Sequence, residues 1–333
     1  MTRHARLRSL AKINLDLRVL ARRADGFHEL RTVFQTISLA DTIEIEYQPA
    51  RRTALELDDA LAIPDNLVLR AASAVLGVIG IHARVRFRLE KKIPMGAGLG
   101  GGSSNAAAVL LALPVLAGRR VPLAALTSLG STLGSDVPFF LCGGTALAID
   151  RGTEVYGLAD VREEPVLVIS SDIHVATAAA YQALGRAGGE GLTSSDLSRK
   201  MNDFQHFLRT LGELRSASAA SAAGANDFER VVFVQHPQLK KMWGRLRKHA
   251  AGARMTGSGS ALFAVFGSTA ERDAARKVLK EDRVFQDCRV MPARMVGGRG
   301  YQRLWRAQLA EHLAPASEAL NDSPWPPQSR YEQ

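Results

Sequence analysis

The sequence predicts an α+β fold, and three stretches carry that prediction. Residues 10–20 (LAKINLDLRVL) alternate apolar and polar side chains, which is typical of a half-buried strand. Residues 84–90 (RVRFRLE) alternate in the same way. Residues 66–79 (NLVLRAASAVLGVI) instead have the spacing of an amphipathic helix. A chain of 333 residues is long enough to bury one large core or two smaller ones.

The N-terminal half is expected to continue this mixture of strands and helices. After the first strand, a turn at residues 23–26 (RADG) leads to strand-like stretches at 27–39 and 41–47. An apolar helix is predicted over 104–113, where Pro114 would bend or end it, and a second helix over 121–134. Residues 145–150 (TALAID) are expected to form another strand.

The C-terminal half is expected to begin near residues 163–165, with a strand at 166–170 (VLVIS). The Ala/Ser-rich segment 212–226 is of low complexity and is predicted to be mobile. His236 and Pro237 should begin a helix, which is followed by a glycine turn at 255–261 (MTGSGSA) and a strand at 262–266. Residues 307–333 have the composition of a flexible tail.

The composition narrows the class of protein. Hydrophobic residues make up 46% of the chain, and two cysteines cannot form a disulfide framework, so we expect a protein of the reducing cytoplasm. The chain contains no signal-peptide pattern and no run of eighteen apolar residues, so we expect no membrane partner. The net charge of +10 suits either a nucleic-acid binder or an enzyme for phosphorylated substrates. Because the basic residues are scattered and aromatics reach only 6%, we expect no nucleic-acid partner.

The stretch 94–108 (PMGAGLGGGSSNAAA) places a glycine-rich loop directly before an apolar helix. It contains G-x-G-x-x-G, but the acidic residue of a dinucleotide site does not follow, and neither do the Walker A residues or the protein-kinase signatures. Glycines let backbone N–H groups approach a ligand, and the helix adds its positive end. No acidic residue occurs from 91 to 135, which favours a polyphosphate ligand over a flexible surface loop.

This glycine loop resembles the phosphate-binding motif of the GHMP small-molecule kinases. Further motifs occur in the order typical of that family, between about residues 8 and 306: AKINLDL, RADGFHEL, DNLVLRAA, LGSDVPFF, NDFE and MTGSGSALF. Together they are most similar to the members that phosphorylate the 2-hydroxyl of a cytidine diphosphate derivative of methylerythritol, in the non-mevalonate isoprenoid pathway. Another GHMP kinase, or a catalytically silent nucleotide-binding regulator, remains an alternative. Asp150 stands where the family usually has glycine.

The resemblance implies a two-domain architecture, with an active site between the domains. Residues 1–162 would form a ribosomal-S5-like domain that binds ATP, and 163–306 a ferredoxin-like domain on the substrate side, followed by the tail at 307–333. ATP and Mg²⁺ are the expected cofactors, and a cytidine diphosphate alcohol is the expected partner. The sequence leaves a monomer and a homodimer equally open.

The same resemblance assigns candidate site residues. Asp136 is expected to be the catalytic base, although a helix N-cap is an alternative from the sequence alone. Lys12 would stabilise charge beside it. The expected ATP-binding residues are Asn66, Lys91, Pro94, Met95, Gly96, Ala97, Gly98, Leu99, Gly100, Gly101, Gly102, Ser103, Ser104 and Asn105. The expected substrate-binding residues are Asn14, Phe27, His28, Thr177 and Tyr181, and no metal ligand is assigned. The turn at 255–261 either closes on the substrate or is a plain hairpin turn.

Overall fold

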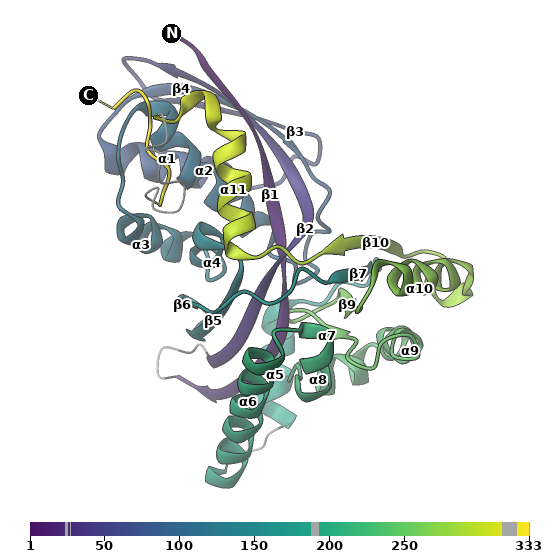
Figure 1. The fold of residues 1–333 in the computed structure, drawn as a ribbon. Helices are drawn as coiled ribbons and strands as arrows, with labels where there is room; N and C mark the ends of the chain where they lie inside the picture. The colour runs from purple at the N-terminus through teal and green to yellow at the C-terminus, as the bar shows by residue number, and fades with distance from the viewer. Residues whose placement is uncertain (24–25, 27, 188–192, 315–324, 333) are drawn as a thin grey trace.

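The computed structural model contains two β-sheets, each covered by its own helices (Figure 1). It describes all residues except 24–25, 27, 188–192, 315–324 and 333. The first sheet has the order β3-β4-β2-β5-β6, and β1 pairs with β2 outside this path. Its strands are β1 (Arg3–Arg22), β2 (His28–Pro49), β3 (Ala54–Asp59), β4 (Ala83–Glu90), β5 (Thr145–Asp150) and β6 (Glu154–Gly157).

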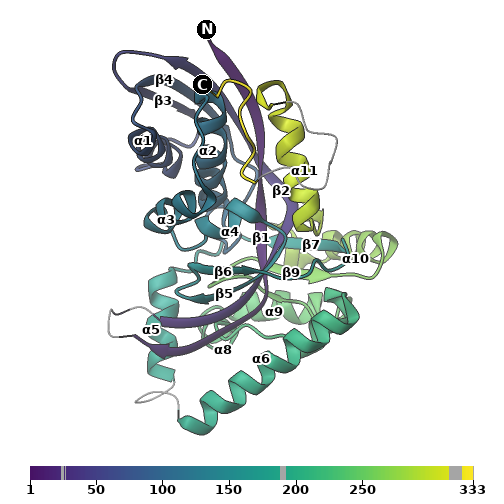
Figure 2. The ribbon, with the colours of Figure 1, turned by 60° about the vertical axis from the view of Figure 1, so that its left-hand side comes forward.

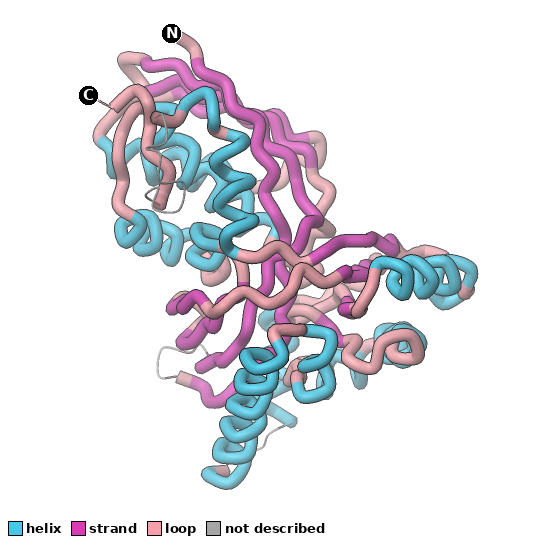
Figure 3. The backbone as a smooth tube through the Cα atoms, in the orientation of Figure 1, coloured by secondary structure: helices cyan, strands magenta, loops and turns pink. Residues whose placement is uncertain are grey.

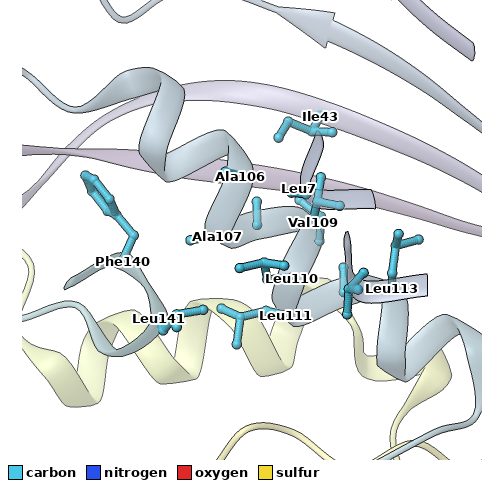
Figure 4. Close-up of a cluster of buried hydrophobic side chains, with 14 of the residues drawn as sticks. Leu7, Ile43, Ala106, Ala107, Val109, Leu110, Leu111, Leu113, Phe140 and Leu141 are labelled. Atoms are coloured by element: carbon cyan, nitrogen blue, oxygen red, sulfur yellow. The ribbon is translucent and has the colours of Figure 1, made fainter. Parts of the chain in front are cut away.

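The helices of the first core are α1 (Leu67–Ile79), α2 (Gly101–Ala117), α3 (Leu123–Leu133) and α4 (Val137–Cys142). Helix α2 is buried almost all round, because its sequence carries alanine, leucine and valine on every face. Figure 4 shows its side chains against those of Leu7, Ile43 and Leu141. The helix is longer than predicted at both ends, and Pro114 lies inside it, one turn before the C-cap Gly118.

The second sheet has the order β10-β7-β9-β8, and all its neighbouring strands are antiparallel. Its strands are β7 (Pro165–Ser170), β8 (Arg254–Met255), β9 (Leu262–Val265) and β10 (Arg289–Arg294). Around it lie α5 (Thr177–Ala187), α6 (Ser194–Leu214), α7 (Ala217–Ala220), α8 (Glu229–Gln235), α9 (Pro237–Leu246) and α10 (Thr269–Glu281). The expected boundary at residue 163 falls between β6 and β7.

The first two strands connect the two cores. The structure has one continuous strand β2 of 22 residues where the sequence predicts two, and β1 is 20 residues long. The C-terminal end of β1 and the N-terminal end of β2 extend to the helices of the second core (Figure 2). There Leu17 forms a β-bridge with Asn226, and Leu30 belongs to the same buried cluster as Phe228. Residues of β1 can therefore face groups from both halves of the chain.

The Ala/Ser-rich segment 212–226 is ordered, which corrects the prediction of a mobile stretch. It contains the end of α6, then α7 and the short 3₁₀ helix Ser221–Ala223. Ala217 and Ala220 are buried. The carboxylate of Glu164 accepts hydrogen bonds from the backbone N–H groups of Ala217 and Ser218. Small side chains here permit close packing rather than mobility.

The described residues of 307–333 also pack against the molecule, where the sequence predicts a flexible tail. They follow α11 (Gly298–Gln308), which lies on the first core through Tyr301 and Trp305 (Figure 3, where helices are cyan). The Trp325 indole N–H donates to Leu141 O at 2.9 Å. The Ser329 hydroxyl donates to Val115 O at 2.7 Å. Buried aromatic and hydroxyl contacts thus fix this segment against α2 and α4. Within the described chain, the structure contains no helix with the length and apolarity needed to cross a membrane.

Candidate active site

A cavity of about 1530 Å³ is lined by residues of both cores. Among its lining residues are eight of the predicted site residues: Lys12, Asn14, His28, Gly98, Ser103, Asp136, Thr177 and Tyr181. These come from β1, β2, the glycine loop, the start of α4 and α5, so the fold gathers segments that are far apart in the sequence. Phe27 lies outside the described residues.

Lys12 and Asp136 form an ion pair at the cavity, with Nζ 3.5 Å from Oδ2. The Lys12 side chain is only 4% exposed, whereas that of Asp136 is 29% exposed. Burial lowers the pKa of Lys12, and the charge of Asp136 and its hydrogen bond oppose that shift. Asp136 is the N-cap residue of α4, yet its carboxylate makes no capping hydrogen bond within the described chain. The carboxylate is therefore available to the cavity, and the capping interpretation is not supported.

Asn14 sits beside Lys12 and joins three elements. Its Oδ1 accepts from the Lys12 ammonium at 2.8 Å and from Gly257 N at 2.9 Å. Its Nδ2 donates to the Thr32 hydroxyl at 2.8 Å. Irregular register on either side of this stretch, between Leu10 and Ala11 and beyond Asn14, turns the polar face of β1 toward the second core. Asn14 is 1% exposed, so these hydrogen bonds fix its side chain within the protein.

The glycine loop has the backbone geometry of an anion cradle. Gly96, Gly98 and Gly100 have φ values of +63°, +79° and +70°, which glycine adopts readily. A Cβ at Gly100 would lie 2.8 Å from the Phe140 ring, so the loop also packs tightly. The N–H groups of the first turn of α2, from Gly101 onward, have no partner inside the helix and carry its positive end. The loop and helix together form a site suited to phosphate.

A group of aromatic side chains also lines the cavity. The His28 ring stacks on Tyr181, with centroids 4.8 Å apart and an interplanar angle of 23°. Tyr181 meets Phe228 edge-on, also at 4.8 Å. Burial raises the pKa of Tyr181 to about 12 and lowers that of His28. Nearby, the hydroxyls of Thr177 and Ser258 are 2.9 Å apart, which places the second glycine turn beside α5.

Several predicted ATP-binding side chains are engaged inside the protein. Asn66 caps α1 by accepting from Val68 N, and it donates to Asp59. Lys91 pairs with the fully buried Asp41 and donates to Asn105 Oδ1 at 3.0 Å. These three side chains therefore make specific contacts within the protein beside the loop.

The remaining predicted loop residues are divided between surface and interior. The Ser104 hydroxyl donates to Leu10 O at 2.6 Å, and Ser104 is buried. Met95 is 57% exposed, whereas Ala97 and Leu99 are buried. Pro94, Gly101 and Gly102 are partly or fully accessible and do not line the cavity. Within the loop, Gly98 and Ser103 are the residues that do.

The sequence prediction missed several lining groups. Arg22, Arg151, Lys200 and Arg230 give the cavity basic side chains, and these are scattered along the chain with no motif to mark them. Phe228 belongs to NDFE and Gly257 to MTGSGSA, so both were within recognised motifs without an assigned role. The turn at 255–261 does connect two paired strands, β8 and β9, as a hairpin turn would.

Comparison with known proteins identifies a family for this chain. The GHMP kinases N terminal domain matches residues 66–144, and the GHMP kinases C terminal domain matches 201–282. A 4-diphosphocytidyl-2-C-methyl-D-erythritol kinase of Solibacter usitatus is 50% identical over 331 residues, covering 99% of this chain and 98% of that protein. The chain belongs to this kinase family.

Two further relatives agree. The kinase of the same name from Syntrophus aciditrophicus is 37% identical, covering 81% of this chain and 93% of that protein. A crystal structure of 4-(cytidine 5'-diphospho)-2C-methyl-D-erythritol kinase superimposes with a TM-score of 0.69 at 34% identity, covering 89% of this chain and all of that one. The predicted GHMP kinase fold and the predicted phosphotransferase class are confirmed.

Proposed function

We propose that this protein transfers the γ-phosphoryl group of ATP to the 2-hydroxyl of 4-diphosphocytidyl-2-C-methyl-D-erythritol. The family membership supports the substrate, and the observation that carries the chemistry is the Lys12–Asp136 pair at a cavity that also reaches the glycine loop. The acceptor hydroxyl would lie between that pair and the phosphate cradle.

Asp136 then takes the proton of the hydroxyl as its oxygen attacks phosphorus, and the bond from phosphorus to the ADP oxygen breaks. The Lys12 ammonium lies 3.5 Å from the Asp136 carboxylate. Its positive charge would stabilise the negative charge that develops on the transferred phosphoryl group. Because Lys12 is buried and held by Asn14, its ammonium is positioned before the substrate binds. The chain contributes position and charge, which are what phosphoryl transfer chiefly requires.

The glycine loop fits ATP, since the positive φ angles and the open first turn of α2 suit a polyphosphate. Mg²⁺ would neutralise charge on those phosphates. Among the described residues, no group of three His, Cys, Asp or Glu side chains is placed to hold a metal ion. We therefore propose that magnesium enters with the nucleotide, and we assign it no protein ligand.

The aromatic side chains that line the cavity are proposed to bind the cytosine base. Tyr181 offers a flat apolar face, and the His28 ring nitrogens can donate or accept at a base edge. The basic lining from Arg22, Lys200 and Arg230 suits the diphosphate between the base and the alcohol.

A substrate panel tests the proposed function. We expect ATP-dependent ADP release with 4-diphosphocytidyl-2-C-methyl-D-erythritol, and at least a hundredfold lower kcat/KM with methylerythritol 4-phosphate, because the unoccupied base site would forgo its contacts. The panel also contains homoserine and mevalonate, which are acceptors of other GHMP kinases. Comparable rates with methylerythritol 4-phosphate would refute base recognition, and a preference for either of the other two would replace the proposed substrate.

The role of Asp136 is tested by Asp136→Asn. We expect kcat to fall by about 10²–10⁴, the usual contribution of general-base catalysis, while calorimetry shows ATP still binding. Asp58→Asn is the matched control, because Asp58 is 80% exposed on β3 and lies outside the cavity lining. A kcat within about tenfold of the parent would remove Asp136 as the base.

A further inference from the structure

Three successive carbonyls of the glycine loop are each held by a donor from elsewhere in the chain. Ala97 O accepts from Ala261 N at 3.2 Å, and Leu99 O accepts from Lys12 N at 3.0 Å. Between them, Gly98 O lies 3.2 Å from the Thr256 hydroxyl. Two of these three donors belong to the second glycine turn, so the C-terminal half of the chain fixes the loop. Thr256 is the one that acts through a side chain.

The Thr256 hydroxyl has two possible acceptors and one proton. Its Oγ1 lies 3.1 Å from Asn14 Oδ1 as well as 3.2 Å from Gly98 O, and it accepts from Asn14 N at 3.1 Å. Asn14 Oδ1 already accepts from Lys12 and Gly257, which fills both of its lone pairs. The hydroxyl therefore lies between Gly98 O and Asn14, and it links the glycine loop to β1.

The two glycine turns also touch directly. A Cβ at Gly98 would lie 2.2 Å from Thr256 O, and one at Gly257 would lie 3.0 Å from the Gly98 Cα. The turn is held from its far side by Asn226, whose Nδ2 donates to Met255 O at 2.7 Å and to Gly257 O at 2.9 Å. Thr256 is fully buried at this crossing. The Thr256 side chain therefore has little freedom to move. Its hydroxyl contacts both the glycine loop, at Gly98, and strand β1, at Asn14.

From this geometry we propose that Thr256 is a positioning residue for phosphoryl transfer. It sets the distance between the loop that would hold the γ-phosphate and the Lys12–Asn14 group that faces Asp136. The inference rests on the proposed function only in assuming that the loop binds ATP. Loss of the hydroxyl would let the loop shift relative to Lys12, and a misplacement of about 1 Å can cost on the order of 10²-fold in rate. ATP would still find the cradle, because its glycines and helix end are unchanged.

The test compares Thr256→Val, which removes the hydroxyl at nearly constant shape, with Thr256→Ser, which keeps it. For Thr256→Val we expect kcat to fall about tenfold to a hundredfold, with the KM for ATP within about threefold of the parent value. Thr256→Ser should recover kcat to within about threefold. Thr145→Val is the matched control, because Thr145 is also buried and donates to Gln35 Oε1 at 2.7 Å outside the cavity lining. It should lose stability but keep kcat within twofold.

The rates are measured with whichever alcohol the parent enzyme phosphorylates, so failure of the proposed substrate does not affect this result. Should Thr256→Val not fold, Thr256→Ala removes the same hydroxyl with less crowding and takes its place. A kcat within twofold of the parent overturns the inference. It is equally overturned if Thr256→Ser is as slow as Thr256→Val, or if Thr145→Val is slowed as much.

Discussion

Replacing Gly98 by alanine should separate the two effects that require glycine there. The residue has φ +79°, and an added Cβ would meet Thr256 O at 2.2 Å and Thr256 C at 2.9 Å. Gly80, the C-cap of α1, has φ +65°, and a Cβ there would meet nothing within 4 Å. Gly80→Ala therefore carries the cost of the backbone angle alone and is the matched control.

The magnitudes follow from these contacts. A left-handed φ costs a non-glycine residue about 1–2 kcal/mol, which is the whole expected destabilisation for Gly80→Ala. At Gly98 the Cβ would sit more than 1 Å inside van der Waals contact with backbone atoms, which cannot rotate away as a side chain can. Such overpacking adds about 1–3 kcal/mol, so Gly98→Ala should cost roughly 2–5 kcal/mol. The folded fraction should also lose about 10²-fold in kcat, because the loop and the second turn are pushed apart.

Urea unfolding followed by tryptophan fluorescence measures the stability difference, since Trp305 lies in the first core and Trp243 packs on the second. Initial rates of ADP release at saturating ATP measure kcat for the folded protein. If the two variants lose the same stability within about 0.5 kcal/mol, and Gly98→Ala keeps its kcat, the crossing of the two turns does not constrain the enzyme.

Two further substitutions test other parts of the fold. Burial raises the pKa of Glu229 from 4.5 to about 7, so the parent loses stability as pH rises through that window, whereas Glu229→Gln should not. The advantage of this variant in free energy of unfolding, measured with urea, should grow between pH 4.5 and 7 by at most about 3 kcal/mol, and a constant difference would contradict it. Trp325→Phe removes the indole donor to Leu141 O and should cost about 0.5–1.5 kcal/mol, seen as a lower Tm. An unchanged Tm would mean that the C-terminal segment does not stabilise α4.

The sequence predicts most accurately the elements whose apolar pattern is set by residues close together in the chain. Strand β4 alternates buried and exposed residues along its whole length, as its Val-Arg-Phe-Arg-Leu pattern predicts. Helix α9 begins at Pro237, as predicted, and it buries Leu239, Met242 and Leu246 on one face. In both cases one apolar face meets one core, so the period of the sequence is enough.

The burial of the polar face of β1 could not be predicted from the local sequence pattern. Lys12, Asn14 and Asp16 alternate with apolar residues, and alternation alone makes a solvated face the simplest interpretation. All three are buried, because the glycine loop, the second glycine turn and Ala225 contact that face. Asp16 is satisfied there by Arg18 and by the N–H of Ala225, more than two hundred residues away. Charged residues can be buried where such partners exist, and the partners cannot be located from the strand itself.

Composition predicts a mobile Ala/Ser segment and a flexible C-terminus, whereas the described residues of both make specific contacts. Few large apolar residues and many small ones normally mean that a segment cannot bury enough surface to become ordered. Here Glu164 supplies acceptors for the N–H groups that begin α7, and Trp325 and Ser329 find carbonyls at the ends of α4 and α2. These hydrogen bonds act together with apolar side chains that the segments bury in the two cores, among them Ala217, Ala220 and Leu309.

Family resemblance located the site but not the direction of every side chain. Lys91 and Asn105 occupy positions that the resemblance assigns to nucleotide binding, yet their polar ends meet Asp41, and Asn105 also donates to Ser9. Asp41 is completely buried and also accepts from Lys92 N and Ile93 N, so it fixes the chain that leads into the glycine loop. Removing Lys91 would leave that carboxylate buried without its counter-charge, a loss of stability before any loss of binding.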